Sequence, residues 1–310
     1  MTRGFITIAT GKEFYYYLAK NLMLSYKLYS KSPCPFAIMC DRENEYTALF
    51  DDVVILENPS NSFWDKFELL KRTPYDETIF IDADCLAYAD LNELWDYFAD
   101  APDFGCCGTN FPIDSDEGIF MADGLCEYTG RIHWKPHFNG GLYFIRKGSF
   151  CDLLYKECLN ICSHYDDFKI ADFVAYKADE AVLAIALAAN GIQAMNEDFS
   201  NVGIGWLSTK KHHDIFTGKC SYATPWHPLV EQGKIMHFRT QNCKKPHYLV
   251  EIEKMNLMLR QGLKPGKTVC EHLSFKDKLL YQYNLRLYWM LSIELFRRVV
   301  HKIQRILKIV

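Results

Sequence analysis

The chain has 310 residues, of which 49% are hydrophobic and 24% are charged. This is an ordinary globular composition, and it excludes intrinsic disorder as the main state. The length allows one large α/β domain with an extension, or two smaller domains. The formal net charge of −4 is unevenly distributed, because residues 274–310 carry eight basic and two acidic side chains whereas residues 1–273 carry 27 basic and 37 acidic ones. A basic tail on an acidic body indicates an anionic partner for the tail, and we expect a membrane surface and no nucleic acid.

The cysteine spacing and the hydropathy of the chain indicate that the protein works in a reducing compartment. The twelve cysteines include no CxxC pair, so neither a zinc framework nor a redox motif is indicated. The first ten residues lack the apolar stretch of a signal peptide. No run of 18 uncharged apolar residues is present. We therefore expect a cytoplasmic protein, bound peripherally to the inner face of the plasma membrane through its tail.

Short apolar runs alternate with helical patterns along the first part of the chain. Strands are expected at 5–9, 36–40, 53–56 and 78–81, and helices at 13–29 and 62–72, with Ser62 as an N-cap. The later expected elements are a strand at 104–107 within loops spanning 101–136, a strand at 138–145, helices at 149–162 and 179–190, a short strand at 235–238 and a helical tail from 275 onward. The signal between 196 and 228 is weak. The fold class is therefore α/β, with a mostly parallel, Rossmann-like sheet flanked by helices. We expect a catalytic domain over 1–273 and a basic amphipathic tail over 274–310.

The most informative motif is an acidic pair at the end of an apolar strand. Asp82, Ala83 and Asp84 follow the strand at 78–81. Ligands of parallel α/β sheets bind just beyond the carboxyl ends of the strands. Since alternate residues of an extended chain share a face, both carboxylates can turn toward one hard cation, which can in turn hold a nucleotide diphosphate. The alternative is that Asp82 caps the following turn and Asp84 is solvated.

The order and spacing of the motifs around this pair resemble the family 8 glycosyltransferases, which include glycogenin and bacterial lipopolysaccharide galactosyl- and glucosyltransferases. The resemblance covers about residues 5–246. It implies the GT-A fold, a UDP-sugar donor, Mn²⁺ or Mg²⁺, and retention of the anomeric configuration.

The first matching motifs imply residues that hold the donor. Ala9, Thr10 and Tyr15 match the strand end and the early tyrosine that hold the base in the family, although Tyr16 or Tyr17 could replace Tyr15. Lys66 stands sixteen residues before Asp82, the spacing of a family lysine that approaches the donor.

The later motifs imply residues around the transferred sugar. Asn139, Gly140 and Gly141 match a strand start at which the glycines permit close backbone approach and the asparagine contacts sugar hydroxyls. Asp179 and Glu180 match the family's Asp-Gln pair, with glutamate in place of glutamine. A carboxylate there could stabilise positive charge at the anomeric carbon or act as a nucleophile. The alternative for both acids is that they complement the helix N-terminus.

A late His…Lys-Pro motif completes the resemblance. It implies that His237 is the third metal ligand and that Lys244 or Lys245 grips the β-phosphate. The interval between histidine and lysine is seven or eight residues here, whereas the family usually has six.

The resemblance therefore implies a metal-dependent enzyme that transfers a hexose from a UDP-sugar to a saccharide or glycolipid acceptor in cell-surface polysaccharide synthesis. The alternatives are a sugar nucleotidyltransferase and a non-catalytic module that binds nucleotide-sugars. A nucleotidyltransferase usually has a Gly-rich basic loop after its first strand, and residues 10–13 match that loop poorly. Leu, Tyr, Trp289 and Phe296 mixed with Arg and Lys in the tail predict a helix lying in the plane of an anionic bilayer, and packing on the catalytic domain or a second subunit is the alternative.

Overall fold

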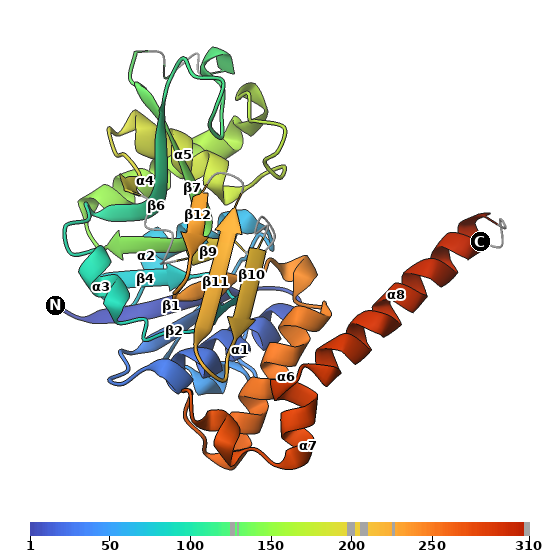
Figure 1. Ribbon diagram of the computed structural model, residues 1–310. Coiled ribbons are helices and arrows are strands. Elements are labelled where there is room, and N and C mark those ends of the chain that lie inside the picture. Colours follow the sequence, from blue (N-terminus) through green and yellow to red (C-terminus); the bar gives the residue numbers. More distant parts are fainter. Residues whose placement is uncertain (125–127, 129, 197–201, 205–209, 225–226, 307–310) are drawn as a thin grey trace. The chain divides into compact units, whose positions relative to one another are not determined.

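The computed structural model describes residues 1–124, 128, 130–196, 202–204, 210–224 and 227–306 (Figure 1). Two compact units are present. Unit 1 comprises Met1–Ile204 and Gly233–His237, and unit 2 comprises Gly205–Gln232 and Phe238–Val310. The boundary expected at 273/274 falls within unit 2, which joins the tail to the preceding α6 (Pro246–Gln261).

Unit 1 is built on a seven-stranded sheet with the order β3-β2-β1-β4-β7-β6-β8. The strands are β1 (Arg3–Ala9), β2 (Phe36–Cys40), β3 (Asp52–Ile55), β4 (Glu77–Ile81), β6 (Phe104–Pro112), β7 (Trp134–Arg146) and β8 (Met195–Asn196). Only β7 runs antiparallel to its two neighbours, β4 and β6; the other four pairs are parallel. The expectation of a mostly parallel sheet is therefore confirmed. The chain proceeds from β1 through β2 to β3 and then returns to β4 on the other side of β1, so a topological switch point lies between the carboxyl ends of β1 and β4.

Helices cover both faces of this sheet, as the alternation of side chains on β1 shows. The helices of unit 1 are α1 (Glu13–Tyr29), α2 (Leu69–Arg72), α3 (Glu93–Tyr97), α4 (Ser149–Ser163) and α5 (Asp179–Ala189). The ring of Phe5 packs against that of Tyr26 in α1, with centroids 5.1 Å apart. Its neighbour Ile6 points to the opposite face and belongs to the core cluster that contains the buried residues of α4 and α5. Because α5 is buried almost all round, it packs as an inner helix of this layer.

A second, three-stranded sheet of unit 1 brings distant segments together. It has the order β5-β13-β9, with β5 (Cys85–Ala87) antiparallel to β13 (Ile235–His237) and β9 (Val202–Ile204) parallel to it. The segment that contains β13 is the short return of the chain into unit 1.

The described residues of unit 2 form an antiparallel sheet and three α-helices. The sheet is β10 (Lys210–Asp214), β11 (Lys219–Thr224) and β12 (His227–Val230). The helices are α6, α7 (Phe275–Asp277) and α8 (Leu285–Ile306), and α8 is one long helix in Figure 1. Buried Lys254 of α6 forms ion pairs with Asp214 (2.8 Å) and Glu251 (3.0 Å), which compensates the charges enclosed in this unit.

The expected elements of unit 1 are present with boundaries shifted by a few residues, except in two places. The helix expected at 62–72 begins as a 3₁₀ helix (Phe63–Glu68) before α2, and Ser62 caps it by accepting a hydrogen bond from the Trp64 N–H. The strands expected at 104–107 and 138–145 are longer, because β6 and β7 continue together as a hairpin from residue 108 to 112 and from 134 to 138. Residues 307–310 of the predicted tail lie outside the described residues.

Candidate metal and donor site

Three predicted metal ligands converge at the end of β4. Asp82 directly follows β4, and its N–H donates to the carbonyl oxygen of Gly141 (3.0 Å). His237 ends β13 and pairs with the first residue of β5, which places it beside Asp84. Its Nε2 lies 3.0 Å from Asp84 Oδ1 and 3.7 Å from Asp82 Oδ2. All three side chains are at most 16% exposed, so the cluster is a largely enclosed set of two carboxylates and one imidazole.

Asn139 fixes the orientation of the His237 ring. The Asn139 Oδ1 accepts a hydrogen bond from the Gly141 N–H (2.9 Å) and lies 3.0 Å from His237 Nδ1. An Nδ1–H donated to this oxygen leaves Nε2 directed at the carboxylates, as in metal-binding histidines held by a second hydrogen-bonding partner. Burial opposes a charge on the imidazole, but Asp84 and Asp82 outweigh it and raise the pKa of His237. The site therefore favours positive charge at this point, either a proton or a cation.

The donor atoms fit a hard divalent cation. Ligand atoms of Asp84, Cys85 and His237 lie within 4.8 Å of one another. Carboxylate and imidazole suit Mn²⁺, whereas a thiolate selects softer metals. Asp82 is outside that group, but its Oδ2 lies 3.7 Å from His237 Nε2, and its carboxylate is a better third ligand for Mn²⁺ or Mg²⁺ than the fully buried Cys85 thiol.

Lys66 links the two acidic parts of the site. Its Nζ lies 2.9 Å from Asp82 Oδ1 and 3.2 Å from Asp179 Oδ2, and it donates to the Gly140 carbonyl (3.1 Å). Burial would lower the pKa of this amine, but the charges of Asp179 and Asp82 outweigh burial and raise it. Desolvation raises the pKa of Asp82, with the Lys66 charge opposing that change. Lys66 therefore stays charged and offsets part of the negative charge of the site. To contact a donor, its Nζ would have to give up one of these three contacts, with Asp82, Asp179 or the Gly140 carbonyl.

The first residues of α5 face the same site. The Tyr143 hydroxyl donates to Asp179 Oδ2 (2.9 Å), and the Gly140 N–H donates to Glu180 Oε1 (2.6 Å). Loss of solvation and the neighbouring Asp179 charge raise the pKa of Glu180 against the effect of the Gly140 N–H. Both acids make specific contacts with β7 in addition to lying at a helix N-terminus.

The paired glycines of β7 are required by the protein's own side chains. A Cβ on Gly140 would lie 2.8 Å from Glu180 Cγ, and one on Gly141 would lie 2.9 Å from His237 Nδ1. Any larger residue would displace these two groups. The glycines thus allow the helix acid and the histidine to approach the strand.

The carboxyl end of β1 carries a second set of polar contacts. The Thr10 hydroxyl donates to Asp65 Oδ2 (2.9 Å), and the Gly11 N–H donates to Asp41 Oδ1 (3.1 Å). The Tyr16 hydroxyl also donates to Asp41, whereas Tyr15 is partly exposed. Asp41 and Asp65 were missed by the sequence analysis. The position of Asp41 directly after an apolar strand was the available signal, the same one that identified Asp82.

The remaining predicted residues divide as follows. Ala9 is buried at the end of β1, beside the switch point, and Ala83 is buried between the two aspartates. Lys244 and Lys245 belong to unit 2, where Lys245 pairs with Glu294 of α8 (3.2 Å). The phosphate contact assigned to one of these lysines stays a prediction.

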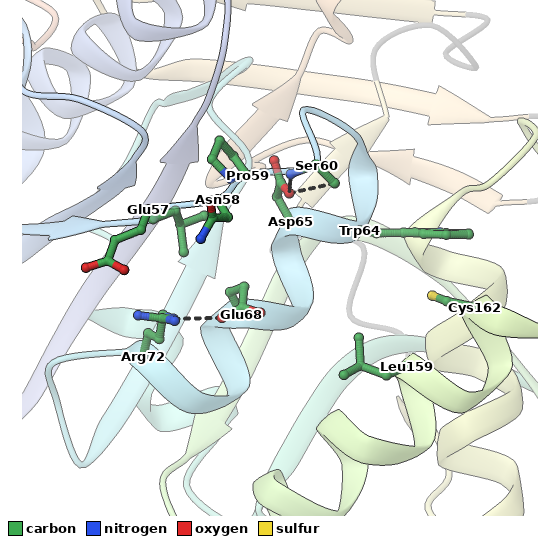
Figure 2. Close-up of a pocket in the computed structure, with 11 residues that line it drawn as sticks. Glu57, Asn58, Pro59, Ser60, Trp64, Asp65, Glu68, Arg72, Leu159 and Cys162 are labelled. Carbon is green, nitrogen blue, oxygen red and sulfur yellow. Dashed lines mark hydrogen bonds and ion pairs between the residues drawn. The ribbon is translucent and has the colours of Figure 1, made fainter.

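A surface hollow lies beside the 3₁₀ helix (Figure 2). Trp64, Asp65, Glu68 and Arg72 line it from one side and Cys162 of α4 from another. Figure 2 shows Asp65 bonded to Ser60 and Arg72 paired with Glu68, so these charged groups are already engaged with the protein. Asp82, Asp84 and His237 do not line this hollow, and we assign the hollow no part in the candidate site.

The fold is shared with a solved glycosyltransferase. The chain is similar to the galactosyltransferase LgtC in complex with donor and acceptor sugar analogues, at 13% identity over 89% of this chain and 99% of that one, with a TM-score of 0.52. It is also similar to an active-site mutant of LgtC in which glutamate replaces glutamine, at 14% identity over 83% and 95% of the two chains, with a TM-score of 0.52. No known protein family and no curated protein matches the sequence. The expected GT-A fold is confirmed by these two similarities.

Proposed function

We propose that the protein is a metal-dependent glycosyltransferase that moves a hexose from a nucleotide-sugar, a UDP-sugar by resemblance, to a saccharide or glycolipid acceptor. The observation that carries this proposal is the convergence of Asp82, Asp84 and His237 at the switch point of a GT-A sheet. Two carboxylates and an imidazole held by Asn139 form a donor set for Mn²⁺ or Mg²⁺. The similarity to LgtC supports the same chemistry.

Each side chain of the site has a role in this proposal. A divalent cation on Asp82, Asp84 and His237 would supply Lewis-acid stabilisation of the departing diphosphate. Lys66 offsets part of the negative charge of the site, and Lys244 or Lys245 would add positive charge against the phosphates. Asn139, Asp179 and Glu180 would face the transferred sugar. By resemblance the reaction retains the anomeric configuration and belongs to cell-surface polysaccharide synthesis.

Glu180 is the point at which this site departs from the resemblance. Its raised pKa allows the protonated and the ionised carboxyl to coexist near neutral pH more readily than at an exposed glutamate. The protonated form can donate a hydrogen bond as a glutamine amide does, and the ionised form can stabilise positive charge at the anomeric carbon.

The function is tested by release of nucleoside diphosphate. A screen of UDP-sugars by thermal shift with Mn²⁺ identifies the donor, and its hydrolysis is then measured with and without added glycosides. We expect Asp82→Asn to abolish turnover while the folded protein keeps its thermal stability within a few degrees, because Lys66 keeps Asp179 as its partner and desolvation already opposes the charge of Asp82. Asp123→Asn is the matched control, because this carboxylate is 65% exposed in a surface pair with Lys169. Substantial activity of Asp82→Asn with Mn²⁺ present would refute the assignment.

The same assay separates the two alternatives. A non-catalytic module would bind a UDP-sugar without releasing UDP. A nucleotidyltransferase would release pyrophosphate from a nucleoside triphosphate and a sugar phosphate, and would leave UDP-sugars intact unless pyrophosphate is added.

We further propose that α8 binds an anionic membrane surface. Among the described residues no helix is both long and apolar enough to cross a bilayer. The exposed apolar side chains of α8 are separated by three, four or seven residues and so share one face: Leu285, Tyr288, Trp289, Leu295, Phe296 and Val299. Arg297 and Lys302 lie outside this face and are exposed.

Binding to vesicles tests this membrane proposal. We expect Phe296→Glu to abolish sedimentation with vesicles that contain phosphatidylglycerol. His301→Glu adds the same charge outside the apolar face and should reduce sedimentation only slightly. Equal sedimentation of Phe296→Glu and the unmodified protein would show that this face does not meet the bilayer.

A further inference from the structure

Three rings form a row on the surface of unit 1. Phe111 of β6 lies against His137 of β7, with ring centroids 5.8 Å apart, and His137 stacks on Phe173 at 5.8 Å with an interplanar angle of 28°. We call Phe111, His137 and Phe173 the aromatic row. Phe173 belongs to the segment between α4 and α5.

The outer ring of the row is open to solvent. Phe173 is 68% exposed, although one face of its ring is covered by His137. A large apolar side chain held in a stacked pair while so exposed contributes little to the core. Burial lowers the pKa of His137 against the opposing charge of Glu117, so its imidazole is neutral at physiological pH. The row therefore presents uncharged ring surface.

The row is continuous with the proposed catalytic site through two chain segments. His137 stands two residues before Asn139 on β7, and both side chains are partly exposed while Phe138 between them is 5% exposed. His137 and Asn139 are no more than about 7 Å apart along the chain, and the pairing of β7 with β6 shifts register directly after Phe138. Phe173 precedes Asp179, the first residue of α5, by six positions. A molecule lying on the row can therefore reach the neighbourhood of Asn139 within about the length of a monosaccharide unit.

The surroundings of the row are acidic. Glu117 faces His137, and Asp114 and Asp116 lie in the same loop. Lys135, which is buried, donates to the Ser115 carbonyl and so holds this loop against β7. Carboxylates beside an aromatic face accept hydrogen bonds from hydroxyl groups, and they repel ligands that carry negative charge.

We propose that the aromatic row is the acceptor-binding platform, and that it selects a pyranoside without negative charge, a neutral or amino-substituted sugar. The inference rests on the proposed glycosyltransferase function and adds the class of acceptor and the residues that hold it. The apolar face of a pyranose ring packs on the open face of Phe173, whose other face rests on His137, while its hydroxyls meet the carboxylates of the 114–117 loop. A hexuronide is excluded by those carboxylates.

Kinetics with a matched control tests the platform. Acceptors are p-nitrophenyl β-glycosides of neutral hexoses, N-acetylhexosamines and hexuronic acids, used with the donor found by thermal shift. We expect Phe173→Ala to raise the acceptor KM about tenfold with a smaller effect on kcat, and Phe173→Tyr to restore the KM. Tyr176→Ala is the control, because Tyr176 is 67% exposed on the same segment but packs edge-on against Tyr165 instead of His137. We expect this control to keep wild-type values.

A binding measurement decides the inference without turnover. Phe173→Trp places a fluorophore on the platform, and Tyr176→Trp places one beside it. Saturable fluorescence changes with methyl β-glycosides of neutral hexoses at Phe173→Trp only, and none with methyl hexuronides, would support the platform. No saturable change at Phe173→Trp up to the solubility limit, or an unchanged acceptor KM in Phe173→Ala, would overturn it. Failure of the wild-type protein to hydrolyse any nucleotide-sugar would instead refute the proposed function, and the fluorescence result would still report on the platform.

Discussion

Lys66→Met is the substitution for which the structure gives the clearest energetic expectation. Lys66 is 10% exposed and forms ion pairs with Asp82 and Asp179, which are 16% and 5% exposed. Methionine keeps most of the volume of the lysine stem but removes the charge. Two carboxylates then remain in a poorly solvated pocket without their internal cation.

Removal of one partner from a buried ion pair costs about 3–5 kcal/mol of folding free energy. For a unit of about 200 residues, each kcal/mol lowers the melting temperature by about 2–4 °C, so we expect a decrease of roughly 6–20 °C. The deficit should become smaller as the pH falls, because desolvation raises the pKa of Asp82 and its protonation removes one of the two uncompensated charges. Excess Mn²⁺, at about 100 times its dissociation constant, should return about 2.7 kcal/mol.

Thermal and urea unfolding in the presence of a chelator measure this effect. Lys71→Met is the matched control, since Lys71 is exposed on α2 and its substitution should change stability by less than about 0.5 kcal/mol. The double variant Lys66→Met/Asp179→Asn should recover part of the loss, because it removes one of the two stranded charges. If Lys66→Met unfolds at the same temperature as the Lys71→Met control at pH 7, the internal ion pair does not compensate the pocket and the reasoning is wrong.

Three further substitutions test separate parts of the structure. The pKa of Glu180 is raised from 4.5, so its contribution to stability is present at low pH and is lost as the pH rises through the raised pKa. Glu180→Gln should therefore become more stable than the wild type as the pH rises from 5 to 8 in chelator. A constant difference in the free energy of unfolding across that range would contradict this. The pKa of Glu77 is lowered from 4.5, chiefly by hydrogen bonds from Arg3 and Arg146 against the opposing effect of burial; Glu77→Gln should lose stability at pH 7, and the difference should vanish as the pH falls below 4.5 through the lowered pKa. Gly262 ends α6 with φ of 63°, so Gly262→Ala should cost about 1 kcal/mol in urea unfolding, and no loss would show that the helix end adjusts without strain.

Local patterns in the sequence were sufficient to predict the strands of the main sheet and the position of the acidic pair. The strands of unit 1 are short apolar runs, and the Asp82 and Asp84 carboxylates follow one of them, so a rule about strand ends located the site. The same rule would have identified Asp41. The helix α6 was not predicted, although Pro246 opens this helix and Gly262 closes it, and these two residue types mark helix ends.

Contacts between distant segments could not be predicted from such patterns. The bond from Thr10 to Asp65 and the role of Gly141 as room for His237 depend on pairs that are 55 and 96 residues apart in the chain. Side-chain alternation predicts which face a residue occupies, but it does not predict which segment of the chain packs there. The aromatic row was not predicted for the same reason. No local pattern marks Phe111, His137 or Phe173, and they form a surface only because the fold brings their rings into contact.

The five residues Gly233–His237 are the only part of the chain after Ile204 assigned to unit 1. They include His237, the imidazole ligand of the candidate metal site. Both ends of this segment continue into unit 2. A cation that binds His237 together with Asp82 and Asp84 would therefore fasten β13 to β5, and detachment of β13 would dissolve the ligand set. Metal binding and the pairing of β13 with β5 are thus thermodynamically linked, and metal binding would slow the exchange of the β13 amide hydrogens with solvent.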